Sequence, residues 1–229
     1  MTKPMGAIPA GYAADQDGML LIGGRRADEL ANQAGGTPLF VYNRDLVVRQ
    51  IVRFRACFGS VKLHYAIKAN SYLPLLKHVA RQVDGLDIAS GGELQCALEA
   101  GADPADISFA GPGKRDEELR AAMEAGVTLN CESEGEAERA LGMAGRPRLA
   151  VRVNPPFEIK GSGMRMGGGA KPFGVDAERV PALVRRILDS GAEWRGFHIF
   201  AGSQALDAGA LIEAQRATVA LAAELAEAV

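Results

Sequence analysis

From about residue 39 onward, the chain alternates short apolar runs with longer runs of helical period. Residues 62–66 (KLHYA) have the length and residue types of a strand, and residues 73–83 place their apolar side chains at helical spacing. Gly101 and Gly126 follow predicted helices, where a left-handed helix end favours glycine. A strand–helix repeat of this kind is typical of parallel βα units.

Six such units can be counted along the sequence. The expected strands are residues 62–66, 85–89, 107–110, 127–131, 149–153 and 194–200. The expected helices are residues 73–83, 92–100, 116–125, 133–141, 177–190 and 208–228. Asp116 is expected to cap its helix, and the spacing of Ser133 and Glu136 predicts a capping box.

Parallel βα units form either an open doubly wound sheet or a closed eight-stranded barrel. No G-x-G-x-x-G follows the first strand, which argues against a dinucleotide-binding sheet. Lys68, Asp87, Arg152 and His198 all follow or end predicted strands, and barrel enzymes keep their chemistry at that edge. The predicted fold class is therefore α/β, a (β/α)8 TIM-type barrel.

The barrel is expected to be incomplete. A full barrel takes about 250 residues, whereas these units begin near residue 39 of a 229-residue chain and stop after a sixth helix. We therefore expect a fragment or a truncated product that, expressed alone, is poorly folded or inactive.

The first 38 residues differ from the rest. Residues 20–22 followed by Gly23 and Gly24 predict a hairpin, and residues 26–34 predict a short helix. We interpret residues 1–38 as an N-terminal segment of a β-domain, and residues 39–229 as a partial barrel.

Composition excludes several classes of function. A net charge of −2 leaves no basic footprint for nucleic acid, and no apolar run reaches the ~18 residues of a membrane span. Cys57, Cys96 and Cys131 are odd in number and scattered, which fits a reducing cytoplasm better than a disulfide framework. The three histidines have no zinc-ligand spacing, so no metal is expected.

The segment around Lys68 carries the strongest chemical signal. A lysine that ends a hydrophobic strand can present a partly desolvated amine, which attacks carbonyl groups. Alone, such a lysine is more often a solvated charge. Its neighbours matter: residues 65–70 (YAIKAN) closely resemble the Schiff-base motif of the ornithine, diaminopimelate and arginine decarboxylases.

Four further motifs resemble the same family, in the same order along the chain. They are residues 87–94 (DIASGGEL), 109–114 (FAGPGK), 150–155 (AVRVNP) and 196–204 (GFHIFAGSQ). The resemblance covers about residues 36 to 229. It implies an alanine-racemase-like barrel that uses pyridoxal 5'-phosphate to decarboxylate a small-molecule amino acid, with the site built in a homodimer of the full-length parent.

The resemblance also implies site residues. The implied cofactor-binding set is Lys68, Asp87, Glu93, Arg152, His198 and Ser203, with Lys68 also catalytic. Lys68 would form the internal aldimine, His198 would stack on the pyridine ring, Ser203 would bond the phosphate, and Arg152 would sit beside the histidine. Asp87 and Glu93 would hold the surroundings of the lysine and histidine.

Taken singly, each of these residues has an ordinary structural role. His198 alone would be a packed histidine, Asp87 a helix cap, Glu93 a surface charge, Arg152 an ion-pair partner and Ser203 a turn residue. The inference rests on their joint order.

Two features depart from the family pattern. Pro172 stands where the family's Ser-Lys-Phe-Gly segment has lysine, and residues 161–171 form an unusual glycine-rich stretch, either a mobile surface loop or a substrate-facing lid. Together with the third- and sixth-strand motifs, this stretch is similar to a subgroup associated with bacterial exosortase and exopolysaccharide gene clusters.

Other functions stay open at this point. An amino-acid racemase uses a similar barrel and lysine, and a non-catalytic cofactor-binding homologue or an inactive fragment would share the same motifs. Continuation of the native reading frame beyond Val229 into a Gly-rich phosphate loop and an acidic motif would discriminate between them.

Overall fold

The computed structural model describes residues 11–157, 164–165, 172–203 and 207–229. Its centre is a parallel sheet in which neighbours along the sheet are also neighbours along the chain. The strands are β4 (His64–Ala66), β5 (Gly85–Ile88), β6 (Ile107–Phe109), β7 (Thr128–Cys131), β8 (Arg148–Asn154) and β11 (Glu193–Ile199). Short β10 (Val175–Asp176) pairs with the end of β8. Within the described residues, β4 and β11 form the two edges of an open sheet.

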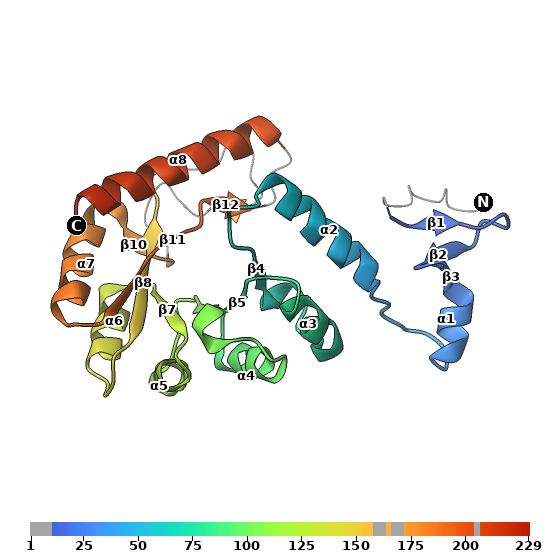
Figure 1. The fold of residues 1–229 in the computed structure, drawn as a ribbon, viewed down its shortest axis with the longest axis horizontal. Coiled ribbons are helices and arrows are strands. Elements are labelled where there is room, and N and C mark those ends of the chain that lie inside the picture. The colour runs from blue at the N-terminus through green and yellow to red at the C-terminus, as the bar shows by residue number, and fades with distance from the viewer. Residues whose placement is uncertain (1–10, 158–163, 166–171, 204–206) are drawn as a thin grey trace.

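A helix follows each of these six strands. The helices are α3 (Leu73–Ala80), α4 (Gly91–Glu99), α5 (Asp116–Ala125), α6 (Glu134–Leu141), α7 (Val180–Asp189) and α8 (Ala208–Glu227). Figure 1 shows them arranged around the outside of a curved sheet. The predicted α/β class and its six parallel βα units are confirmed.

The hydrophobic core lies between the sheet and this outer layer of helices. Phe109, Leu129 and Leu149 on the strands are fully buried together with Leu119 and Ile187 on the helices. Because side chains alternate across a strand, the intervening residues face the inner, concave side. Those residues include the polar side chains of the candidate site.

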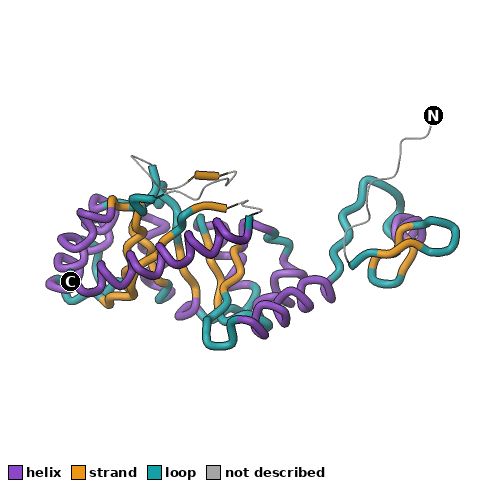
Figure 2. Tube along the Cα trace, turned by 90° about the horizontal axis from the view of Figure 1, so that it is seen from above, coloured by secondary structure: helices purple, strands orange, loops and turns teal. Residues whose placement is uncertain are grey.

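The N-terminal segment forms a separate small unit. Strands β1 (Ala13–Ala14), β2 (Leu20–Ile22) and β3 (Arg25–Arg26) pair antiparallel and lead into α1 (Ala27–Gln33). The predicted hairpin turn at Gly23 and Gly24 is confirmed: both have positive φ, +61° and +78°. Figures 1 and 2 show this unit lying apart from the main sheet.

Helix α2 (Arg44–Cys57) was not expected from the sequence. It begins after Asn43, whose side chain accepts a hydrogen bond from the backbone of Asp45, and it contacts α3. None of its residues is buried in the described structure. A weakly amphipathic, arginine-rich segment of this kind gives little helical periodicity to read.

Two predicted helix starts need correction. The α5 N-cap is Arg115, not Asp116; Glu118 accepts a hydrogen bond from the Arg115 backbone N–H at 3.0 Å. Ser133 does cap α6, since its hydroxyl accepts from the Glu136 backbone at 3.2 Å. The Glu136 carboxylate, however, bonds Lys114 and does not complete the capping box.

A two-stranded antiparallel sheet connects two loops at the carboxyl end of the parallel strands. β9 (Met164–Arg165) follows β8, β12 (Gly202–Ser203) follows β11, and the two pair with each other. Figure 2 shows this small sheet beyond one end of the parallel strands. None of the described helices combines the length and apolar character needed to cross a bilayer.

Candidate functional site

Lys68 stands on a fixed turn at one edge of the sheet. It lies in a single 3-10 turn (Ile67–Ala69) directly after β4, and Ile67 is fully buried beneath it. The Tyr65 hydroxyl donates to the carbonyl of Asn70 at 3.2 Å, which closes the turn. The described structure gives the exposed Lys68 ammonium no hydrogen bond or ion pair; its nearest named contact is the Phe200 ring, 5.9 Å from Nζ to the centroid.

Asp87 and Glu93, two of the predicted site residues, have different environments. Asp87 is the penultimate residue of β5 and lies on the concave side, where its Oδ1 is 3.3 Å from Nδ1 of His64. The Glu93 carboxylate instead accepts from the Ala89 backbone at 2.6 Å, while the Ser90 hydroxyl accepts from the Glu93 backbone at 3.2 Å. Glu93 therefore shapes the turn between β5 and α4.

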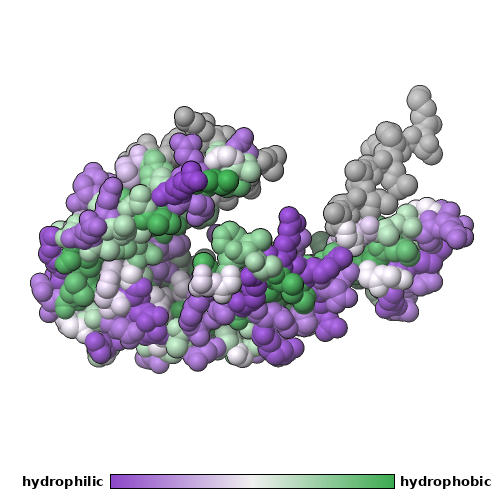
Figure 3. All heavy atoms as spheres, turned by 45° about the horizontal axis from the view of Figure 1, so that its top comes forward, coloured by the Kyte–Doolittle hydropathy of each residue, from purple (hydrophilic) through white to green (hydrophobic). Residues whose placement is uncertain are grey.

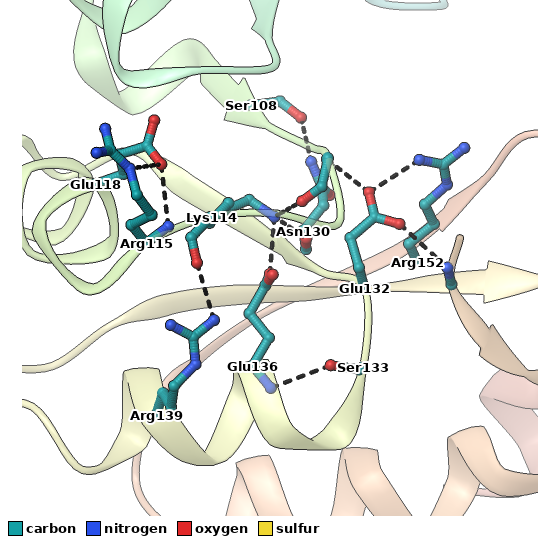
Figure 4. A network of polar contacts seen from close by, with 12 residues as sticks. Ser108, Lys114, Arg115, Glu118, Asn130, Glu132, Ser133, Glu136, Arg139 and Arg152 are labelled. Atoms are coloured by element: carbon teal, nitrogen blue, oxygen red, sulfur yellow. Dashed lines mark hydrogen bonds and ion pairs between the residues drawn. The ribbon is translucent and has the colours of Figure 1, made fainter. Parts of the chain in front are cut away.

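Glu132 and Arg152 form a buried ion pair at the ends of β7 and β8. Their side chains are 2% and 10% exposed, and Nη1 of Arg152 lies 2.9 Å from Oε1 of Glu132 (Figure 4). Glu132 also accepts from the backbone N–H groups of Gly111 at 2.6 Å and Gly174 at 3.1 Å. One carboxylate thus ties together the segments that follow three strands.

Gly174 has to be glycine for this arrangement. Its φ is +79°, and an added Cβ would lie 2.9 Å from the backbone nitrogen of Asn154 and 3.0 Å from the carbonyl of Arg152. Both the left-handed conformation and the close approach exclude a side chain. The Phe173-Gly174 pair, which the sequence retains despite Pro172, therefore closes against the end of β8.

His198 lies opposite Arg152 in the β8–β11 register. Its Nδ1 is buried without a hydrogen-bond partner among the described residues. Burial, followed by the positive charge of Arg152, lowers the pKa of His198 to about 4, against a smaller opposing effect of Asp87 and Glu132. The imidazole is therefore neutral near pH 7.

Two aromatic rings flank the Arg152 guanidinium. Its Cζ lies 4.9 Å from the Phe173 centroid and 5.8 Å from the Phe200 centroid. Phe200, just past β11, is also the ring nearest Lys68. It therefore connects the lysine at one edge of the sheet with the arginine near the other.

A second lysine at the same end of the sheet is fully enclosed. The Lys114 side chain is 1% exposed and its ammonium donates to Glu136 at 2.7 Å, to the Gly111 carbonyl at 2.8 Å and to the Asn130 carbonyl at 2.9 Å (Figure 4). Burial raises the pKa of Glu136, and Lys114 opposes that effect. All three donors of this ammonium are used, so its role is structural.

Ser203 lies in β12, where it pairs with Met164 of β9. The orientation of its side chain falls outside the described part, as does most of the predicted loop at residues 161–171. The predicted phosphate contact of Ser203 therefore stays a prediction.

Lys68 and Arg152 both lie near the Phe200 ring. The charges of Arg152 and Asp87 both act on the pKa of His198. Among the described residues, the Glu93 side chain makes no hydrogen bond or ion pair with these groups. Sequence reasoning missed Glu132, Phe173 and Phe200. Glu132 directly follows a predicted strand, so the strand-end rule that found Asp87 and Arg152 would also have found it.

The donor set fits pyridoxal phosphate. A primary amine without a partner can hold an aldehyde, an aromatic face can pack against a planar ring, and a guanidinium favours an anionic group. The unpartnered, neutral Nδ1 of His198 adds a buried polar atom on the same side of the sheet. These groups converge from β4, β8 and β11.

Comparison with known proteins gives a consistent result. Residues 44–228 match the family model described as "Pyridoxal-dependent decarboxylase, pyridoxal binding domain". The diaminopimelate decarboxylase of Methanothermobacter thermautotrophicus is 36% identical over 200 residues, covering 83% of this chain and 46% of that protein. The Aquifex aeolicus diaminopimelate decarboxylase is 35% identical over 219 residues, covering 92% and 51%.

Solved structures show the same fold. A single-residue variant of the Helicobacter pylori diaminopimelate decarboxylase, crystallised with L-lysine, superposes with a TM-score of 0.78 at 31% identity, covering 87% of this chain and 53% of that one. The chain spans about half the length of the curated relatives that it matches.

Proposed function

Because this chain belongs to the family of pyridoxal-dependent decarboxylases and matches its pyridoxal-binding domain, we propose that the whole protein decarboxylates a free or modified amino acid. The observation that carries this proposal is the Lys68 amine, which stands on a rigid turn, faces the Phe200 ring at 5.9 Å and has no competing partner in the described structure. When bound, pyridoxal phosphate supplies a conjugated ring that accepts the electron pair released as carbon dioxide leaves.

The chain's own residues would divide the work as follows. Lys68 holds the cofactor. Arg152, fixed by Glu132, places a positive charge beside it. His198 stays neutral in a buried position and so adds no second positive charge near the lysine. Glu93 keeps the turn after β5 in shape, which positions Asp87 at the strand end.

Ser203 is proposed to bond the cofactor phosphate. What supports this is its place at the carboxyl end of the strands, in the segment between β11 and α8. Residues 1–38 are proposed to belong to a β-domain, and residues 39–229 to the cofactor-binding barrel. The N-terminal unit is antiparallel and lies apart from the sheet, which supports that division.

The finer substrate and partner assignments also belong to the proposal. Several relatives are diaminopimelate decarboxylases, so a basic or di-acidic amino acid is the first substrate class to try. A homodimer in the cytoplasm is proposed from the family resemblance. Three free cysteines, one exposed and one buried, are compatible with a reducing compartment.

The test is release of carbon dioxide by the protein expressed from its native reading frame. Diaminopimelate, ornithine, arginine and lysine would be compared, for wild type and Lys68→Ala. We expect release with one substrate, lost in the variant. Inversion of the α-carbon without release of carbon dioxide would replace the proposal with a racemase.

A further inference from the structure

We propose that Glu132 is a positioning residue of the cofactor site. It holds the guanidinium of Arg152 where that group can contact a ligand bound by Lys68, and it does not touch the ligand itself. The inference rests on the proposed function and deepens it, because it makes cofactor affinity depend on a buried carboxylate outside the predicted set of site residues. It follows from the contacts of the Glu132 side chain.

The Glu132 carboxylate uses both of its oxygens inside the protein. Oε1 accepts from Nη1 of Arg152 at 2.9 Å and from the Gly111 backbone N–H at 2.6 Å, while Oε2 accepts from the Gly174 backbone N–H at 3.1 Å. The side chain is 2% exposed. With three donors around it and almost no exposed surface, the carboxylate is not placed to contact a ligand. Any effect of Glu132 on cofactor binding therefore has to pass through one of its partners.

This arrangement requires the charge of the carboxylate as well as its shape. A carboxylate accepts at both oxygens, whereas an amide presents an NH2 group in place of one of them. In Glu132→Gln the NH2 group would face either the Gly174 N–H or the two donors at Oε1, so at least one bond is lost. Arg152, whose side chain is 10% exposed, would also lose its counter-charge, and a buried cation without one is strongly disfavoured. The guanidinium should therefore leave its place even where the fold survives.

Arg152 is the partner of Glu132 that reaches the ligand site. Its Cζ lies 5.8 Å from the centroid of the Phe200 ring, and Nζ of Lys68 lies 5.9 Å from the same centroid. A guanidinium at that place favours an anionic group of a ligand that Lys68 holds. Phe173 packs 4.9 Å from the same guanidinium, and the N–H of its neighbour Gly174 bonds Glu132. One carboxylate thus holds both Arg152 and the segment that packs against it.

Glu136 is a matched comparison for Glu132. Its side chain is 3% exposed and binds the ammonium of Lys114 at 2.7 Å, so each glutamate pairs with a buried cation at the same end of the sheet. The three donors of Lys114 are already used inside the protein, which leaves none for a ligand. A change at Glu136 should therefore affect stability but not cofactor binding.

The experiment titrates the apo form of the protein, expressed from its native reading frame, with pyridoxal phosphate and follows the absorbance band of the bound cofactor. Glu132→Gln and Arg152→Met are measured singly and together, which gives a double-mutant cycle for cofactor affinity. Glu132→Asp keeps the charge, and Glu136→Gln is the matched control. Circular dichroism checks that each variant folds. Should Glu132→Gln not fold, Glu132→Asp takes its place in the cycle.

We expect Glu132→Gln to weaken cofactor binding roughly tenfold, the usual worth of a charge-assisted hydrogen bond, and Glu132→Asp to weaken it less. In the Arg152→Met background the same substitution should change the affinity by less than about twofold, because the partner through which Glu132 acts is gone. Glu136→Gln should bind the cofactor like wild type.

Unchanged affinity in Glu132→Gln, or an equal loss with and without Arg152, would overturn the inference while leaving the proposed function intact. A loss in Glu136→Gln as large as in Glu132→Gln would also overturn it, because the effect would then come from any buried ion pair of this region. Absence of a cofactor band in wild type would instead refute the proposed function, and this inference with it.

Discussion

Lys68 and Lys114 both follow strands of one sheet at its carboxyl end, yet their surroundings differ in every respect that matters chemically. Lys114 is 1% exposed and donates to three acceptors. Lys68 is exposed, and the described structure gives it only an aromatic neighbour. Figure 3 shows the molecule hollowed on one side.

The difference shows how a structural lysine can be told from the lysine that we propose is reactive. An amine whose donors are all satisfied inside the protein cannot attack a carbonyl without breaking those bonds, and its loss leaves acceptors buried. An amine without partners has nothing to break. Burial alone would have pointed to the wrong residue, because the more deeply buried of the two lysines is the structural one.

The largest effect is expected for Lys114→Met. It would leave the Glu136 carboxylate and two backbone carbonyls buried without a donor, so the free energy of unfolding should fall by about 3–5 kcal/mol. Urea denaturation measures this. Lys62→Met is the matched control, since that side chain is 73% exposed with its ion-pair partner at 3.4 Å, and it should change stability by less than about 0.5 kcal/mol.

The double variant Lys114→Met/Glu136→Leu sharpens the same point. Removing the Glu136 carboxylate, which Lys114→Met leaves without a donor, should recover part of the lost stability, because two apolar side chains can replace a buried ion pair. A Lys114→Met protein as stable as wild type would show that this lysine is not structural, and the comparison would lose its basis.

A smaller, pH-dependent effect on the free energy of unfolding is expected from His198. Its pKa in the folded protein, about 4, lies below the ordinary histidine pKa of 6.5, so near pH 5 the unfolded chain binds a proton that the folded chain does not. This contribution to stability is complete above pH 6.5 and is lost as the pH falls toward 4. Between pH 7 and pH 5, wild type should lose about 2 kcal/mol more than His198→Asn.

Denaturation at the two pH values, for both proteins, gives that difference directly. Other carboxylates and histidines titrate in both proteins, and their contributions cancel in the comparison. Equal losses would mean that His198 is as well solvated in the folded protein as in the unfolded chain.

The smallest effect is expected for Lys68→Met. With no hydrogen bond or ion pair to lose in the described structure, the apo protein should keep its free energy of unfolding to within about 0.5 kcal/mol. The same urea denaturation measures it. A loss as large as that of Lys114→Met would place Lys68 among the structural residues.

Most of the fold could be predicted from the sequence, because each parallel βα unit combines a short apolar strand run with a segment whose apolar residues have helical spacing. Most predicted element boundaries lie within a few residues of those in the structure. The third predicted helix matches α5 (Asp116–Ala125) at both ends. Helix α2 escaped notice because its apolar residues are interleaved with arginines, and in the structure none of its residues is fully buried.

The candidate site was predictable only in part. Strand-end position and motif order pointed to Lys68 and Arg152, which the structure brings to the same ring. They could not show which side chains meet across the sheet. The Glu132–Arg152 pair and the place of Phe200 between two cations depend on strand register and on curvature, which no local pattern encodes.

The most direct test of the central claim is borohydride reduction of the protein, expressed from its native reading frame and loaded with pyridoxal phosphate, followed by peptide mapping. The account predicts that the label is fixed on Lys68, that Lys114 stays unlabelled, and that Lys68→Ala loses the label while remaining folded. A label fixed on Lys114, or on any lysine other than Lys68, would contradict it.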